Sequence, residues 1–122
     1  MSNFKLFVTF LLCSLLVGCA TPAKMTDESM VKYDKDTDYA IIPSPDGFSI
    51  AIHYSRYQFI PESSAVATAC KSAVTTVAYE HADKQGRKIH PLNEQRIRIS
   101  MGRNGLTGVT SCSAMAVAEW EK

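Results

Sequence analysis

Residues 95–120 read QRIRISMGRNGLTGVTSCSAMAVAEW and contain the pattern that decides the fold. In the first part of this stretch, apolar residues occupy every second position: Ile97, Ile99 and Met101. Such alternation is typical of a strand with one buried face. Asn104-Gly105 is the favoured dipeptide of a two-residue type I′ hairpin loop. We therefore predict a hairpin of strands 95–101 and 106–120, with Ile97 opposite Cys112 and Cys112 on the buried face.

One amphipathic helix is predicted upstream of this hairpin, over residues 63–85. Its apolar stripe recurs at helical spacing and consists of Val66, Ala69, Cys70, Ala73, Val74, Val77, Ala78 and His81. Ser63 or Ser64 suits the N-cap position, and Gly86 suits the position after the last turn. Cys70 lies in the stripe, so two independent patterns place Cys70 and Cys112 on surfaces that face each other.

A further strand is predicted over residues 48–60, where Phe48, Ile50, Ile52 and Tyr54 alternate with smaller or polar residues. The element order is then β-α-β-β. We expect an α+β domain with one helix packed on a mostly antiparallel three-stranded sheet, in which strand 106–120 is central. A short extra edge strand near 39–42 precedes the turn Pro43-Ser44-Pro45-Asp46-Gly47.

The first nineteen residues have the pattern of an export signal. Lys5 precedes an apolar run from Leu6 to Val17, about 12 residues or roughly 18 Å as a helix. A membrane-spanning helix needs about 20 residues, so the run fits a signal peptide better than a permanent span. Leu16-Val17-Gly18-Cys19 resembles the lipobox of bacterial lipoproteins. That resemblance implies cleavage after residue 18 and lipidation of Cys19, with palmitate among the acyl chains.

In the lipoprotein family, an Asp after the lipidated cysteine tends to retain the protein in the inner membrane. Ala20 stands at that position, and the resemblance therefore implies an outer-membrane anchor with the domain in the periplasm. That compartment is oxidising. Because Cys13 leaves with the signal peptide and Cys19 is lipidated, Cys70 and Cys112 remain, and we expect them to form one disulfide.

Residues 19–38 are predicted to form a lipidated N-terminus and a flexible tether to a single domain over 39–122. The stretch is polar and lacks a sustained period of 2 or 3.6. Asp34, Asp36 and Asp38 have the spacing that begins a calcium-binding loop, but the Gly and distal Glu of such a loop are missing. We expect no metal or other cofactor.

The sheet face away from the helix is the candidate partner site. Strand alternation predicts that it carries Arg96, Arg98, Ser111, Ser113, Met115 and Tyr57. A formal charge of +1 argues against a nucleic-acid partner, and the residues form no catalytic motif. We expect a non-catalytic outer-membrane lipoprotein that binds an envelope protein or an anionic envelope polymer. Two alternatives remain: an accessory enzyme or inhibitor acting on the cell wall, and a component of a secretion or conjugation apparatus.

Overall fold

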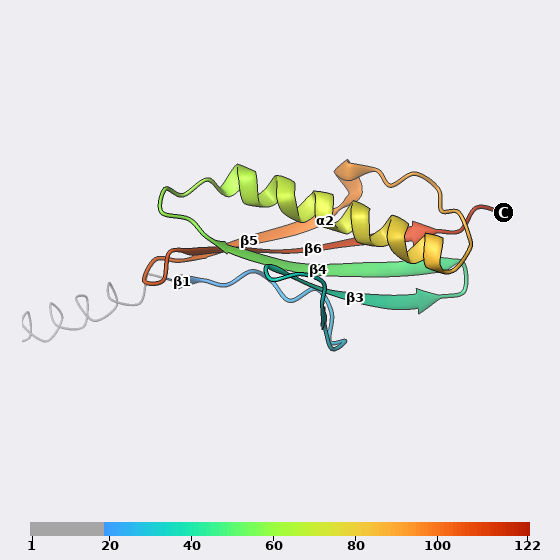
Figure 1. Cartoon of the computed structure of the whole chain (residues 1–122), viewed down its shortest axis with the longest axis horizontal. Helices are drawn as coiled ribbons and strands as arrows, with labels where there is room; N and C mark the ends of the chain where they lie inside the picture. The colour runs from blue at the N-terminus through green and yellow to red at the C-terminus, as the bar shows by residue number, and fades with distance from the viewer. Residues whose placement is uncertain (1–18) are drawn as a thin grey trace, which may run out of the picture.

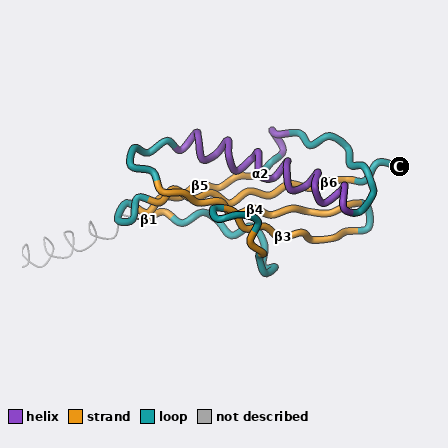
Figure 2. Tube along the Cα trace, in the orientation of Figure 1, coloured by secondary structure: helices purple, strands orange, loops and turns teal. Residues whose placement is uncertain are grey.

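Two eleven-residue strands, β4 (Gly47–Tyr57) and β6 (Val109–Glu119), lie side by side at the centre of the sheet. They belong to a computed structural model that describes residues 19–122 (Figure 1). The predicted signal peptide, with the first three residues of the lipobox-like stretch, lies outside the described part. One long helix, α2 (Ser63–Lys84), covers one face of the sheet (Figure 2). The fold class is therefore α+β, as predicted.

The sheet is wider than expected. Its six strands within residues 19–122 run in the order β1-β5-β6-β4-β3-β2, and all pairs are antiparallel. The three predicted strands correspond to β4, β6 and β5 (Arg98–Asn104), with β6 between the other two as expected. The expectation of three strands overlooked two-residue strands β1 (Cys19–Ala20) and β2 (Val31–Lys32) and gave too little length to β3.

Strand β3 (Thr37–Ser44) is the extra edge strand, and it has eight residues. Ser44 pairs with Gly47, so that only Pro45 and Asp46 form the turn to β4. Pro43 was expected in that turn but pairs with Phe48 inside the strand. Strand β2 pairs only with the first half of β3, so no strand hydrogen-bonds to the outer edge of β3 at Pro43. A proline, which has no N–H to donate, is therefore tolerated there.

The helix ends as predicted but starts differently. Glu62 occupies the N-cap position without a side-chain cap, and the Oε1 of Gln58 accepts a hydrogen bond from its backbone N–H at 3.1 Å. The predicted serine cap is therefore wrong. At the other end Gly86 has a φ of 64°, and the N–H of Arg87 donates to the carbonyl of Ala82 at 3.1 Å. This Schellman geometry needs a left-handed residue, which glycine adopts at little cost.

The core lies between α2 and the two central strands. Large apolar side chains come from β4, namely Phe48, Ile50 and Ile52, and all three are buried. Each contributes about 1.5–3 kcal/mol through burial. Strand β6 presents only small side chains to the helix: Cys112, Ala114, Ala116 and Ala118. Small residues on a central strand allow the helix to approach the sheet closely, as the sequence predicted.

The β5–β6 connection differs from the predicted Asn104-Gly105 turn. The strands end at Asn104 and Val109, which are paired, and the left-handed residue of the loop is Gly108, with a φ of 74°. The Oδ1 of Asn104 accepts hydrogen bonds from the N–H groups of Leu106 and Thr107 at 2.9 and 3.3 Å. This side-chain-stabilised turn replaces the type I′ turn.

The longer loop changes the register by four residues. Arg103 pairs with Thr110 and not with Leu106, and Cys112 pairs with Met101 and not with Ile97. Because side chains alternate with a period of two, an even shift leaves every residue on its predicted face. Cys112 therefore faces the helix, where it forms a disulfide with Cys70, with the two Cα atoms 6.5 Å apart.

We expect the double substitution of Cys70 and Cys112 by Ala to destabilise the domain markedly. The bond closes a loop with a sequence separation of 42 residues, for which the chain-entropy model gives a stabilisation of about 4 kcal/mol. Each kcal/mol shifts the Tm of a small domain by about 4–8 °C. Thermal unfolding followed by circular dichroism measures the change. Dithiothreitol should lower the Tm of the wild type and leave that of the double variant unchanged; equal Tm values in all samples would contradict the prediction.

Candidate functional site

The sheet face opposite α2 contains five of the six predicted partner-site residues. Arg98 lies on β5; Ser111, Ser113 and Met115 lie on β6; and Tyr57 ends β4. The pairs Arg98↔Met115 and Tyr57↔Val109 confirm that these positions alternate away from the helix-facing residues. Arg96 is the exception, because it belongs to the short 3-10 helix η1 (Glu94–Arg96) and not to β5.

The prediction that this strand starts at residue 95 is wrong, because β5 starts at Arg98. A local side-chain hydrogen bond competes with strand pairing before that residue. The Oδ1 of Asn93 accepts the N–H of Gln95 at 3.0 Å, and the N–H of Arg96 donates to the carbonyl of Asn93 at 2.9 Å. Asn is a strong N-cap residue. Residues 94–96 therefore turn away from the sheet, and the ladder with β6 begins only at Arg98.

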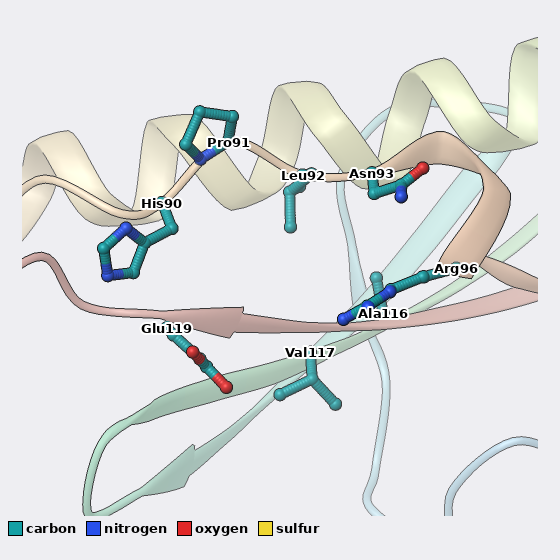
Figure 3. Close-up of a pocket in the computed structure, with 8 residues that line it drawn as sticks. All are labelled: His90, Pro91, Leu92, Asn93, Arg96, Ala116, Val117 and Glu119. Atoms are coloured by element: carbon teal, nitrogen blue, oxygen red, sulfur yellow. The ribbon is translucent and has the colours of Figure 1, made fainter.

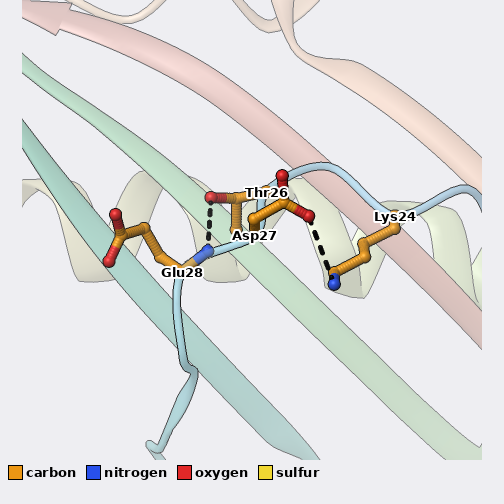
Figure 4. A network of polar contacts seen from close by, with 4 residues as sticks. All are labelled: Lys24, Thr26, Asp27 and Glu28. Carbon is orange, nitrogen blue, oxygen red and sulfur yellow. Dashed lines mark hydrogen bonds and ion pairs between the residues drawn. The ribbon is translucent and has the colours of Figure 1, made fainter.

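The central part of the open face is covered by the chain's own residues 21–30. The N–H of Ala23 donates to the Oγ of Ser100 at 2.8 Å, and the segment lines a shallow cavity together with His53 and Ser113. Figure 4 shows this segment in front of the strands, with α2 behind them. Ser113 is 7% exposed and Ala51 is fully buried, so this part of the face is not open to a partner.

This coverage was not predicted from the polar composition of the segment. Apart from the bond between Ala23 and Ser100, its polar contacts are local: Lys24 pairs with Asp27 at 3.3 Å, and the N–H of Glu28 donates to the Oγ1 of Thr26 at 3.1 Å. The domain boundary expected at residue 39 also lies inside the sheet, since β2 and the start of β3 precede it. The flexibility of residues 20–38 stays a prediction.

A groove lies where the open face meets the edge of β6. The ladder with β5 ends at Met115, and the next contact on that side is the hydrogen bond from the N–H of His90 to the carbonyl of Glu119 at 2.9 Å. Between these points, residues 91–96 bulge away from β6 and leave a groove of about 390 Å³ (Figure 3). Its lining residues are His90, Pro91, Leu92, Asn93, Arg96, Ala116, Val117 and Glu119.

The groove brings together the cation of Arg96, the carboxylate of Glu119 and the apolar side chains of Leu92, Ala116 and Val117. Figure 3 shows the side chain of Arg96 extending from η1 toward β6. Among the described residues no carboxylate lies within ion-pair distance of it. Val117 is 65% exposed beside it, and nearby Arg98 donates to the Sδ of Met115 at 3.2 Å. Strand alternation predicted Arg96 on this face, but the bulge that forms the groove was not predicted; Pro91, which has no backbone N–H to donate to a ladder, is a local signal for it.

Three ionisable groups outside the groove, Tyr33, Asp34 and His81, have shifted pKa values. The pKa of Tyr33 is raised, mainly because its hydroxyl donates a hydrogen bond to Glu80 at 2.9 Å. The pKa of Asp34 is lowered, mainly because its carboxylate accepts the N–H of Asp36 at 2.9 Å. Asp34 thus stabilises a turn.

In the described part of the chain, no group of three His, Cys, Asp or Glu residues gathers as metal ligands would.

Comparisons with protein-family models, with curated proteins and with solved structures find no match for this chain. Within residues 19–122, no helix has the length and apolar character needed to cross a membrane.

His81 gives a testable pH dependence of stability. Its ring packs edge-on against Phe48 with centroids 4.7 Å apart. Burial lowers its pKa below the ordinary 6.5, and Lys84 adds to the effect. The folded state therefore binds fewer protons than the unfolded state just below pH 6.5, so the stabilisation present above that pH is lost as the pH falls toward the folded-state pKa.

We expect the Tm to fall between pH 7.5 and pH 5.5, and the fall to be smaller in His81→Leu, which has no proton to bind. Thermal unfolding in matched buffers measures both slopes. Other groups contribute equally to the two proteins, so an identical pH dependence would contradict the assignment to His81.

Proposed function

We propose that this protein is an outer-membrane lipoprotein, anchored through Cys19, whose disulfide-bonded domain binds another cell-envelope component without catalysing a reaction. The lipobox resemblance of residues 16–19 supports the anchor. The groove at the β6 edge supports the binding role. The observation that carries the proposal is the juxtaposition of an Arg96 guanidinium without a carboxylate partner and an exposed Val117 side chain in that groove.

The positions of the anchor and the groove agree with this role. Strand β1 pairs Cys19 with Asn104, which is itself paired with Val109 at the start of β6. Val117 lies eight residues farther along β6, about 27 Å away at the usual rise per residue. A lipid at Cys19 therefore leaves the groove well away from the membrane, where it is accessible to a partner.

The chemistry of the groove favours a segment of an envelope protein over a polymer of repeated anionic units. Arg96 can bind one carboxylate bidentately, and Val117 and Leu92 offer apolar contacts. Glu119 lines the same groove and would repel a second negative charge. We therefore propose a partner segment that presents one acidic and one apolar side chain.

Lipidation is tested by Cys19→Ser. We expect the variant to lose the mass of the acyl chains and to leave the outer-membrane fraction, because the hydroxyl cannot form the thioether. Mass spectrometry and membrane fractionation measure the two effects. Cys13→Ser is the matched control and should behave as the wild type. A variant at position 19 that keeps the mature mass and remains in the outer membrane would refute the anchor.

Partner binding is tested by in-cell photocrosslinking from position 117, followed by identification of the captured protein by mass spectrometry. Loss of a charge-assisted hydrogen bond costs about 1.5–3 kcal/mol, so Arg96→Glu should lower the crosslinking yield about tenfold or more. Lys88→Glu, an equal charge change at an exposed site outside the groove, is the control and should not lower it.

A photocrosslinker at exposed Thr76 of α2 should capture nothing in common with position 117. Equal capture from both positions, or an undiminished yield with Arg96→Glu, would show that the groove is not the binding site. Loss of capture with Arg98→Glu alone would move the site to the remaining open face beside Met115.

A further inference from the structure

One end of the domain carries an unusual concentration of exposed apolar side chains. Of the nine large apolar residues exposed among residues 21–122, four lie at the end of β4, in the β4–α2 connection and in the β5–β6 loop. They are Tyr57, Phe59, Ile60 and Leu106, with exposed fractions of 62%, 85%, 71% and 92%. Figure 1 shows the two connections side by side at the end of the molecule where β1 lies, and we call this end the apolar tip.

The apolar tip is a braced surface, because the two connections are bonded to each other. The N–H of Gln58 donates to the carbonyl of Gly108 at 2.8 Å, and the guanidinium of Arg103 donates to the carbonyl of Gln58 at 3.2 Å. The Tyr57 ring packs against Gly108 so closely that a Cβ at this position would lie only 2.6 Å from the ring. The backbones that carry the exposed side chains are therefore held next to each other.

Local hydrogen bonds also satisfy part of the polar backbone in these connections, at Gln58, Glu62, Leu106 and Thr107. The amide of Gln58 bonds both the N–H and the carbonyl of Glu62, at 3.1 and 3.2 Å. In the β5–β6 loop, the Oδ1 of Asn104 accepts hydrogen bonds from the N–H groups of Leu106 and Thr107. Backbone groups with internal partners lose less when water is removed, so this surface can enter a less polar environment at a reduced cost.

The charge distribution also suits a lipid surface. Residues 57–61 and 104–108 contain no charged side chain, although charged residues make up 20% of the chain. Three charged residues border these stretches in the sequence: Arg56 and Glu62 stand on either side of the first, and Arg103 precedes the second. An apolar surface bordered by cations is the arrangement of interfacial membrane-binding elements, in which the basic groups meet the phosphates of anionic lipids.

The position of Cys19 indicates that a membrane covers the apolar tip. Cys19 pairs with Asn104, the residue that starts the β5–β6 loop. We infer that the apolar tip lies in the headgroup region of the same membrane that holds the lipid on Cys19, with Leu106, Phe59 and Ile60 reaching the acyl boundary. This inference rests on the lipidation proposed above and adds a fixed orientation: β4 and β6 point away from the membrane, and the groove faces the periplasm.

The orientation is tested with the full mature lipoprotein in vesicles of phosphatidylethanolamine with a minority of phosphatidylglycerol. Leu106→Cys supplies one free thiol for an environment-sensitive nitrobenzoxadiazole label, since Cys70 and Cys112 form the disulfide. Val117→Cys is the matched control at an exposed site near the other end of β6. We expect the label at 106 to shift its emission to shorter wavelength, brighten several-fold and be quenched by doxyl-labelled lipids. The label at 117 should show none of these changes.

A second variant separates apolar insertion from mere proximity to the anchor. Phe59→Asp with Ile60→Asp should abolish the lipid quenching of the label at 106, while vesicle flotation, which depends on the acyl chains, should be unchanged. These side chains are solvent-exposed, and an unchanged circular dichroism melt verifies that the double variant folds.

Three outcomes would overturn the inference. Flotation without lipid quenching at 106 means that the protein is anchored but the apolar tip stays in water. A shorter-wavelength emission without lipid quenching means that a protein, such as a second copy of the chain, covers the tip. Failure of every variant to float means that Cys19 carries no lipid, which overturns the proposed anchor together with the orientation.

Discussion

The bond between Cys70 and Cys112 fixes how the helix lies on the sheet, and most of the structure follows from that placement. Rotation of α2 by one residue, about 100°, would remove Val66 and Val74 from the core. A shift of β6 by one residue would exchange its helix-facing alanines for the residues of the opposite face. The disulfide opposes both errors, because it forms only when the apolar stripe of the helix and the buried face of β6 meet.

Much of this arrangement could be predicted from the sequence because it depends on periodicity. The helical spacing of the apolar residues placed Cys70, and strand alternation together with the expected two-residue loop at Asn104-Gly105 placed Cys112 on the buried face. The predicted loop was too short, yet the resulting register error was four residues, and an even error leaves the faces unchanged. Predictions that rest on a period of two tolerate such errors, whereas predictions of which residues lie directly opposite each other do not.

The parts that could not be predicted depend on single side-chain bonds or on contacts between distant segments. The side chain of Asn93 accepts one hydrogen bond that starts a 3-10 helix in place of an earlier start of β5. This helix forms the bulge beside β6. Residues 21–30 cover His53 and Ser113 although they show no apolar period. As a result, only part of the predicted partner face is accessible. Arg96 remains next to Val117, but it reaches that position from a 3-10 helix and not from a strand.

Strand β6 connects these features because its outward-facing residues meet a different neighbour at each level. Val109 stands beside the paired ends of β4 and β5 at the apolar tip, Ser113 lies beneath residues 21–30, and Val117 is exposed in the groove. The opposite face of the same strand is uniform, with small residues buried under α2 along its length. The uniform face is what the helix requires for close packing, and it leaves the outward positions to differ. One strand can therefore join the end proposed to face the membrane to the end proposed to bind a partner without a change in the core.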